Sequence, residues 1–247
     1  MADFNDRALR AAPVSSVDAG LRAYMVRVYN YMFLGLIVTG LVAYATYQAS
    51  VVTAAGSIVG LTPFGQTLFN SPLRLVVAFS PLVLVFALRG AIPRLSAGAA
   101  LMSFLGFAAV LGLSLSYIFL AYTMTSIGMV FFITAAMFGG MSLYGYTTRS
   151  DLTGWGSFLI MGMFGIVIAS VVNYWLQSQM LMFVYSCAGV IIFTGITAFY
   201  TQRIKEMYSV QDDGTVTGRK AIYGALLLYI SFLNLFTSLL NLLGGRR

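Results

Sequence analysis

Long stretches without a single charged residue constrain this chain more than any other feature. One lies between Arg27 and Arg74, and three more cover residues 95–148, 152–202 and 221–245. A membrane-spanning helix needs roughly 20 mainly apolar residues, whereas a β-barrel is built from much shorter alternating segments. Only 9% of the residues are charged, against about 25% in soluble domains. The sequence therefore predicts an all-α integral membrane protein.

Polar breaks divide these stretches into seven predicted transmembrane helices. The second stretch is too long for one span and divides at residues 122–126, and the third divides at 177–179. Residues 53–70 are rich in Gly, Thr and Ser and are expected to form a loop. The predicted helices cover about 29–52, 72–91, 97–121, 127–147, 155–176, 181–202 and 221–243.

The positions of Lys and Arg predict the orientation of the bundle, because positively charged loops stay in the cytoplasm. They fall in the N-terminal segment and in the connections after the second, fourth and sixth helices: Arg7, Arg10, Arg22, Arg27, Arg89, Arg94, Arg149, Arg203, Lys205, Arg219 and Lys220. The other connections contain only Arg74, at a helix edge. Arg246 and Arg247 are discordant, but they follow the last helix. The N-terminus is thus expected in the cytoplasm and the C-terminus outside.

Two consequences follow for the ends and the partners of the chain. Residues 1–28 are expected to form a cytoplasmic tail, and residues 29–247 a single transmembrane domain. No apolar segment precedes Tyr29, so the first helix is expected to remain as an anchor and not to be cleaved as a signal. The net charge of +7 is explained by topology, and no nucleic-acid partner is predicted.

The residue types that are missing exclude many chemistries. The chain has no His and only one cysteine, Cys187, in the middle of an apolar run. Histidine bases, zinc sites built on paired cysteines and disulfide frameworks are therefore unavailable. Cys187 is interpreted as a small packing residue. We predict no enzymatic activity, no cofactor and no metal site.

Arg89 and one face of the last helix are the candidate functional features within the membrane. Ionisable residues at membrane depth are costly and suggest function. Arg74 and Arg89 bracket the second helix, and both are expected to extend toward the interfaces. The alternative is that Arg89 points into the bundle.

The last helix carries four polar residues on one continuous face: Ser231, Asn234, Ser238 and Asn241. This face either bonds to neighbouring helices or lines a wet path. Gly139, Gly140 and Gly145 are interpreted as close helix contacts.

Several strings of residues resemble signatures of the Bax inhibitor-1 family. Residues 193–208, FTGITAFYTQRIKEMY, are similar to helix 6 of that family, and residues 224–236, GALLLYISFLNLF, to helix 7. Residues 141–148 and 151–155 are similar to its bacterial branch, and the resemblance extends from Asp18 to the end. It implies a seven-helix fold with helix 7 central in the bundle, a bacterial inner-membrane location and a proton-regulated calcium leak. In some bacterial members it also implies association with a membrane-anchored AAA protease.

The chain departs from the family at two acidic positions. Family members carry an aspartate where this chain has Tyr200, and a second where it has Ser231. The resemblance implies that the two aspartates form a buried pair whose shared proton senses pH. Tyrosine stays neutral up to a pKa of about 10 and serine does not titrate, so this pair is not expected to sense physiological pH.

Arg89 corresponds to an arginine that in the family can meet the aspartate pair. We therefore predict Arg89, Tyr200, Ser231 and Asn234 as pore or gate residues. Ser231 is the expected hydrogen-bond partner of the buried Tyr200 hydroxyl.

Three functions remain open from the sequence. The first is a calcium-leak-type channel whose leak is weak or insensitive to pH. The second is a non-conducting interaction protein that modulates a membrane-anchored AAA protease or a stress response. The third, an unrelated seven-helix transporter, leaves the matching strings unexplained. The expected partners are the lipid bilayer, calcium ions and the protease.

Overall fold

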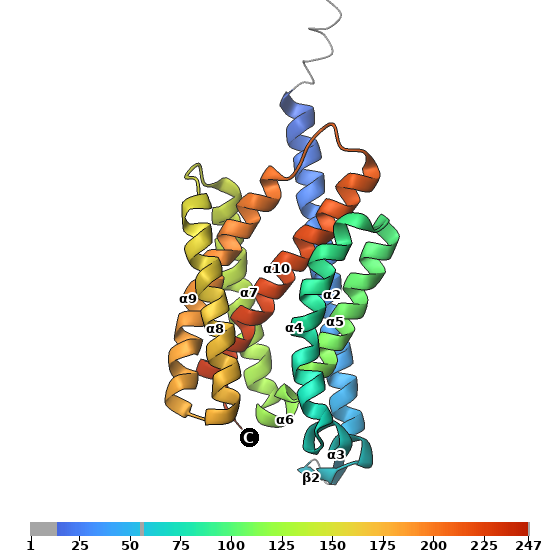
Figure 1. Ribbon diagram of the computed structural model, residues 1–247, viewed down its shortest axis with the longest axis vertical. Helices are drawn as coiled ribbons and strands as arrows, with labels where there is room; N and C mark the ends of the chain where they lie inside the picture. The colour runs from blue at the N-terminus through green and yellow to red at the C-terminus, as the bar shows by residue number, and fades with distance from the viewer. Residues whose placement is uncertain (1–13, 55–56, 247) are drawn as a thin grey trace, which may run out of the picture.

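Seven helices that are long and apolar enough to cross a membrane form the protein (Figure 1). The computed structural model describes residues 14–54 and 57–246, and this count refers to them. The prediction of an all-α integral membrane protein with seven transmembrane helices is confirmed. The long helices are α2 (Val14–Ser50), α4 (Leu73–Ala91), α5 (Ala97–Leu115), α7 (Met124–Thr147), α8 (Thr153–Leu176), α9 (Gln179–Glu206) and α10 (Gly214–Leu243).

Helix α2 begins well before the expected start of the first span at Tyr29. The described helix starts at Val14, so the second half of the expected 1–28 tail is helical; residues 1–13 lie outside the described part. The residues Tyr24, Val28 and Met32 follow each other at helical spacing and are all buried. This buried face continues into the bundle. The helix therefore extends toward the N-terminus beyond the charged residues.

Most described residues between 51 and 70 form strands and a helix, although the sequence predicted a loop over 53–70. Strands β1 (Val51–Ala54) and β2 (Ser57–Leu61) pair as an antiparallel hairpin, and helix α3 (Pro63–Asn70) follows. The Thr62 hydroxyl caps α3 by accepting from the Gly65 backbone N–H at 3.1 Å. A Cβ at Gly65 would lie 2.2 Å from the Ser50 carbonyl oxygen. The Thr and Gly residues that suggested a loop are thus a helix cap and a close backbone contact.

The third span is bent, although the sequence predicted one helix over 97–121. Helix α5 ends at Leu115, and the short α6 (Ile118–Ala121) completes the span. The buried Ser116 hydroxyl donates to the Leu113 carbonyl at 2.7 Å, a local bond that bends helices. At the next polar break, Gln177 takes a left-handed conformation with φ of 49° and ends α8.

Helix α10 lies in the middle of the bundle. It packs against α9, α2, α7 and α5, and in Figure 1 it crosses between α7–α9 on one side and α2, α4 and α5 on the other. Leu226, Tyr229 and Leu235 have no exposed surface. By contrast, α8 packs mainly on α9 and is largely exposed. The expectation that the last helix is central is confirmed.

The connections that carry positive charge gather at one end of the bundle. In Figure 1 the links α4–α5, α7–α8 and α9–α10 lie at the same end as the described start of α2, and the C-terminus lies at the other. We call this the basic end; it carries Arg22, Arg94, Arg149, Arg203, Lys205, Arg219 and Lys220. The alternation expected from the sequence is thus present in the fold.

Candidate functional site

Arg89 joins three helices near the basic end. It lies in the last turn of α4 and is partly buried. Its guanidinium group interacts with the hydroxyl groups of Tyr223 on α10 and Tyr200 on α9. Arginine has five N–H donors and no acceptor, so it presents only donors to the two hydroxyl oxygens. Arg89 therefore has the inward orientation that the sequence left as an alternative.

The contacts of Arg89 connect a peripheral helix to the core. Apart from this bridge, α4 packs mainly on α5, α3 and the 3₁₀ turn that follows it, Ile92–Arg94. Tyr200 has only 6% of its surface exposed, and its ring lies 5.5 Å from that of Phe199. A buried hydroxyl group costs free energy unless it is hydrogen-bonded. The Arg89 guanidinium group is the charged donor next to the Tyr200 hydroxyl.

Ser231 and Asn234 make hydrogen bonds within their own helix. The Ser231 hydroxyl donates to the Leu227 carbonyl at 3.1 Å, and the Asn234 amide donates to the Ile230 carbonyl at 2.8 Å. Tyr200 interacts with Arg89, whereas the Ser231 hydroxyl, its expected partner, bonds within its own helix. The structure thus brings Arg89 and Tyr200 together, and it shows no bond from Ser231 or Asn234 to either of them among the described residues.

The remainder of the polar face of α10 contacts neighbouring helices. The Asn241 side chain accepts from the Tyr122 hydroxyl at 2.9 Å. Ser238 lies against Gly189 of α9, where a Cβ would come within 2.4 Å of the serine hydroxyl. These contacts agree with the interpretation of this face as a bonding surface between helices.

A buried bond between Thr39 and Tyr229 was not predicted from the sequence. Tyr229 of α10 is completely buried, and its hydroxyl lies 2.5 Å from the Thr39 hydroxyl of α2. Thr39 also lies 3.0 Å from the Ala108 carbonyl of α5 and 2.9 Å from the Gly35 carbonyl. This cluster joins α2, α5 and α10 in the centre of the bundle.

A second chain of hydroxyl groups joins α2, α7 and α9. The Tyr29 hydroxyl is hydrogen-bonded to that of Ser142, which lies 3.0 Å from the Thr201 hydroxyl. The Thr201 hydroxyl also lies 2.8 Å from the Thr197 carbonyl, within hydrogen-bond reach. The sequence signal for this chain was limited to hydroxyl residues in otherwise apolar helices.

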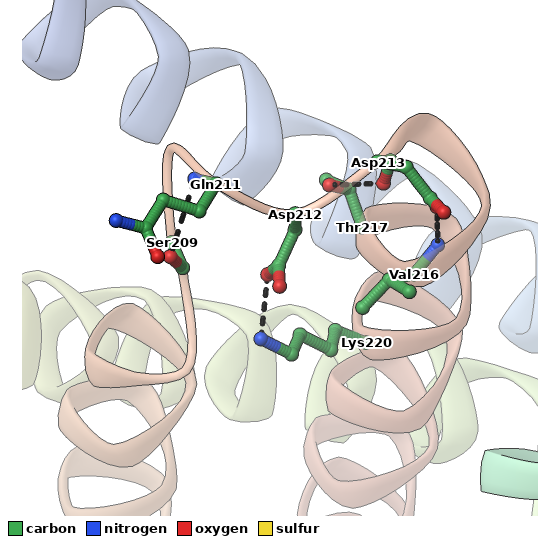
Figure 2. Close-up of polar contacts among 7 residues, drawn as sticks. All are labelled: Ser209, Gln211, Asp212, Asp213, Val216, Thr217 and Lys220. Carbon is green, nitrogen blue, oxygen red and sulfur yellow. Dashed lines mark hydrogen bonds and ion pairs between the residues drawn. The ribbon is translucent and has the colours of Figure 1, made fainter.

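The α9–α10 connection is tied together by polar contacts (Figure 2). The Lys220 ammonium group donates to the Asp212 carboxylate at 2.5 Å, and both side chains are mostly buried. The Asp213 carboxylate caps α10 by accepting from the Val216 N–H at 2.7 Å, and its carbonyl accepts from the Thr217 hydroxyl at 3.0 Å. These bonds fix the start of α10 at Gly214, nine residues before Tyr223.

Acidic groups stay near the helix ends and in the connections. The described acidic residues are Asp18, Asp151, Glu206, Asp212 and Asp213. No group of three or more His, Cys, Asp or Glu side chains that could hold a metal ion occurs within 14–54 and 57–246.

A bundle of seven membrane helices, with the last at its centre and an arginine bridge at its basic end, defines the class of protein. Residues 21–247 match the family model described as "Inhibitor of apoptosis-promoting Bax1". The chain belongs to the Bax inhibitor-1 family.

Relatives from several bacteria match along the whole chain. The inner membrane protein YbhL of Escherichia coli is 43% identical over 246 residues, which cover 98% of this chain and 100% of that protein. An uncharacterized protein of Caulobacter vibrioides is 44% identical over 256 residues, which cover 100% of both chains. The uncharacterized protein RP147 of Rickettsia prowazekii is 38% identical over 247 residues, with the same coverage.

Proposed function

We propose that this protein is a non-enzymatic, calcium-leak-type member of its family in which acid gating is lost and the leak is weak. The observation that carries the proposal is the contact of Arg89 with Tyr200 and Tyr223. Where the family resemblance implies an acidic partner, the guanidinium group here meets neutral hydroxyl groups. We infer that the bridge closes an ion path near the basic end.

Three properties of the bridge support a closed, pH-insensitive path. The positive charge of Arg89 is permanent and repels divalent cations. Hydroxyl groups do not change protonation between pH 5 and pH 8. Calcium prefers carboxylate and carbonyl oxygens, and the described acidic residues lie near helix ends and in connections. The bridge therefore contains no group whose protonation changes between pH 5 and pH 8.

The location and orientation belong to the same proposal. The name of YbhL places that relative in the inner membrane, and we propose the same membrane for this chain. Positive loops stay in the cytoplasm, so the basic end is proposed to face the cytoplasm and the C-terminal end the outside.

A second candidate function is that of a non-conducting interaction protein. Helix α8 packs mainly on α9 and exposes large apolar side chains, among them Trp155, Phe158 and Met161. Such a face can receive a helix of a partner, for example a membrane-anchored AAA protease. In this case the Arg89 bridge closes the ion path permanently.

Calcium flux into liposomes that contain the purified protein tests the proposal. We expect a small flux, above that of protein-free liposomes, that is the same at pH 6 and pH 8. A steep change of flux between these pH values would contradict it and would indicate a titrating group elsewhere. Flux equal to that of protein-free liposomes at both pH values would favour the interaction protein.

A further inference from the structure

A groove runs between α2 and α7 on the lipid-facing side of the bundle. Its cavity volume is about 580 Å³. The walls are apolar, with Leu36 from α2 and Phe131 and Ala135 from α7, and Phe232 of α10 lies at the bottom. The two helices each pack on α10 but hardly contact each other. The groove therefore lies between them, above the central helix.

The groove is open to the hydrocarbon region. Three of its lining residues are strongly exposed: Val26 by 52%, Phe33 by 58% and Leu143 by 64%. From Arg22 to Leu36 the groove follows 15 residues of α2, whose ends are about 21 Å apart at a rise of 1.5 Å for each of the 14 steps. One leaflet of the hydrocarbon core is about 15 Å deep, half of its total of about 30 Å. The groove thus has the length of one leaflet and part of the interface.

Polar groups line only the end of the groove nearest the basic end. Arg22 lies there on α2, and Tyr146 lies there on α7. The hydrogen-bonded pair Tyr29 and Ser142 forms the wall directly below them. The exposed guanidinium group of Arg22 takes part in neither of the salt bridges formed among the side chains of residues 19–53 and 58–246. A guanidinium group binds phosphate oxygens through paired hydrogen bonds.

We propose that this groove binds one acyl chain of an anionic glycerophospholipid from the leaflet at the basic end, with the lipid phosphate at Arg22. The apolar walls match the chain, and the cation at the mouth matches the head group. A helix of a partner protein would be about 10 Å across with its side chains. Binding of such a helix would not require a single cation above an apolar groove. The site lies apart from the Arg89 bridge and does not depend on the proposed ion path.

Two adjacent glycines provide a matched test. The sequence suggested that Gly139 and Gly140 are close helix contacts, but this was wrong, because a Cβ at either position meets no atom within 4 Å. Both are exposed, yet only Gly139 lines the groove. The substitution Gly139→Phe places a ring in the groove from a position where the Cβ meets no other atom, and Gly140→Phe adds the same ring outside it.

The experiment uses the full-length protein in lipid nanodiscs with phosphatidylglycerol that carries a photoactivatable acyl chain. After irradiation, mass spectrometry maps the labelled residues. We expect label on the groove residues of α2 and α7, and we expect competition by unlabelled phosphatidylglycerol but not by phosphatidylcholine. Gly139→Phe should abolish this label and Gly140→Phe should retain it. Arg22→Gln should weaken the preference for phosphatidylglycerol about fivefold.

Each result decides the proposal. Label spread evenly over the exposed residues of the unmodified protein would overturn it, whatever the variants do. Equal competition by both lipids, or an unchanged preference in Arg22→Gln, would refute the anionic head group. Groove label that survives in a folded Gly139→Phe protein would show that the chain lies elsewhere.

Discussion

The Arg89 guanidinium group on α4 interacts with the Tyr200 hydroxyl on α9, two residues that are 111 positions apart in the sequence. The contact connects a peripheral helix to one that packs on the central helix. We infer that this side chain closes the ion path at the basic end of the bundle. The first two predictions concern this contact.

Restoring both acidic groups should restore pH dependence. In the double variant Tyr200→Asp with Ser231→Asp, two carboxylates would share a buried site, and their coupled titration brings one ionisation near neutral pH. We expect calcium flux in liposomes that changes between pH 5 and pH 8. Each single variant is the control, because one carboxylate lacks this coupling and its flux should stay flat. Flat flux in a folded double variant would contradict the prediction.

Removing the charge of Arg89 should loosen the basic end. The change Arg89→Gln leaves Tyr200 and Tyr223 without their charged donor, and a lost bond to a charged group costs about 1.5–3 kcal/mol. We expect a lower melting temperature in detergent and a higher basal calcium flux. Arg89→Lys keeps the charge but not the forked geometry, so it should recover only part of the stability. An unchanged flux in Arg89→Gln would remove Arg89 from the closure.

The buried contact between Thr39 and Tyr229 should contribute measurably to stability. Tyr229→Phe removes one hydroxyl from the centre of the bundle, and a typical hydrogen bond contributes about 0.5–1.5 kcal/mol. Chemical unfolding in detergent should show that the free energy of unfolding falls by this amount. A double-mutant cycle with Thr39→Val should give a stabilising coupling energy between the two hydroxyl groups. The matched control is Tyr44→Phe, since Tyr44 is 45% exposed. Equal losses in both tyrosine variants would argue against a special role of the buried bond.

Reporter fusions test the orientation. Fusions at Asp212 should report the cytoplasm, because the α9–α10 connection lies at the basic end. Fusions near Gly65 and Ser178 should report the outside. If Asp212 and Ser178 report the same side, α9 does not cross the membrane and the seven-span topology is wrong.

The sequence predicted the helices well because a charge inside the membrane is costly. Stretches without charge can cross the bilayer and polar breaks cannot, so the number of helices followed from residue type alone. The helix ends were less predictable. The start of α2 at Val14 depends on the buried face formed by Tyr24 and Val28, and the hairpin after Ser50 depends on pairing that Gly and Thr do not reveal.

The contacts of the site depend on the rotation of each helix, which the sequence does not contain. Of three neighbouring glycines, only Gly145 makes the expected close contact, where a Cβ would lie 2.3 Å from the Ala198 carbonyl oxygen. Ser231 was a reasonable partner for Tyr200 on adjacent helices, yet the Tyr200 hydroxyl points to Arg89. Thr39 and Tyr229 are 190 residues apart, and no local pattern connects them.

The central position of α10 sets the order in which this protein can be built. Helix α10 is the last span to leave the ribosome, yet it covers the inward faces of α2, α5, α7 and α9. Those helices enter the membrane earlier and pack in separate groups, α2 with α5 and α7 with α9, which residues 214–243 join. Assembly of the bundle is therefore completed only after translation, and a nascent chain that stops before Gly214 contains six spans but lacks the helix that unites them.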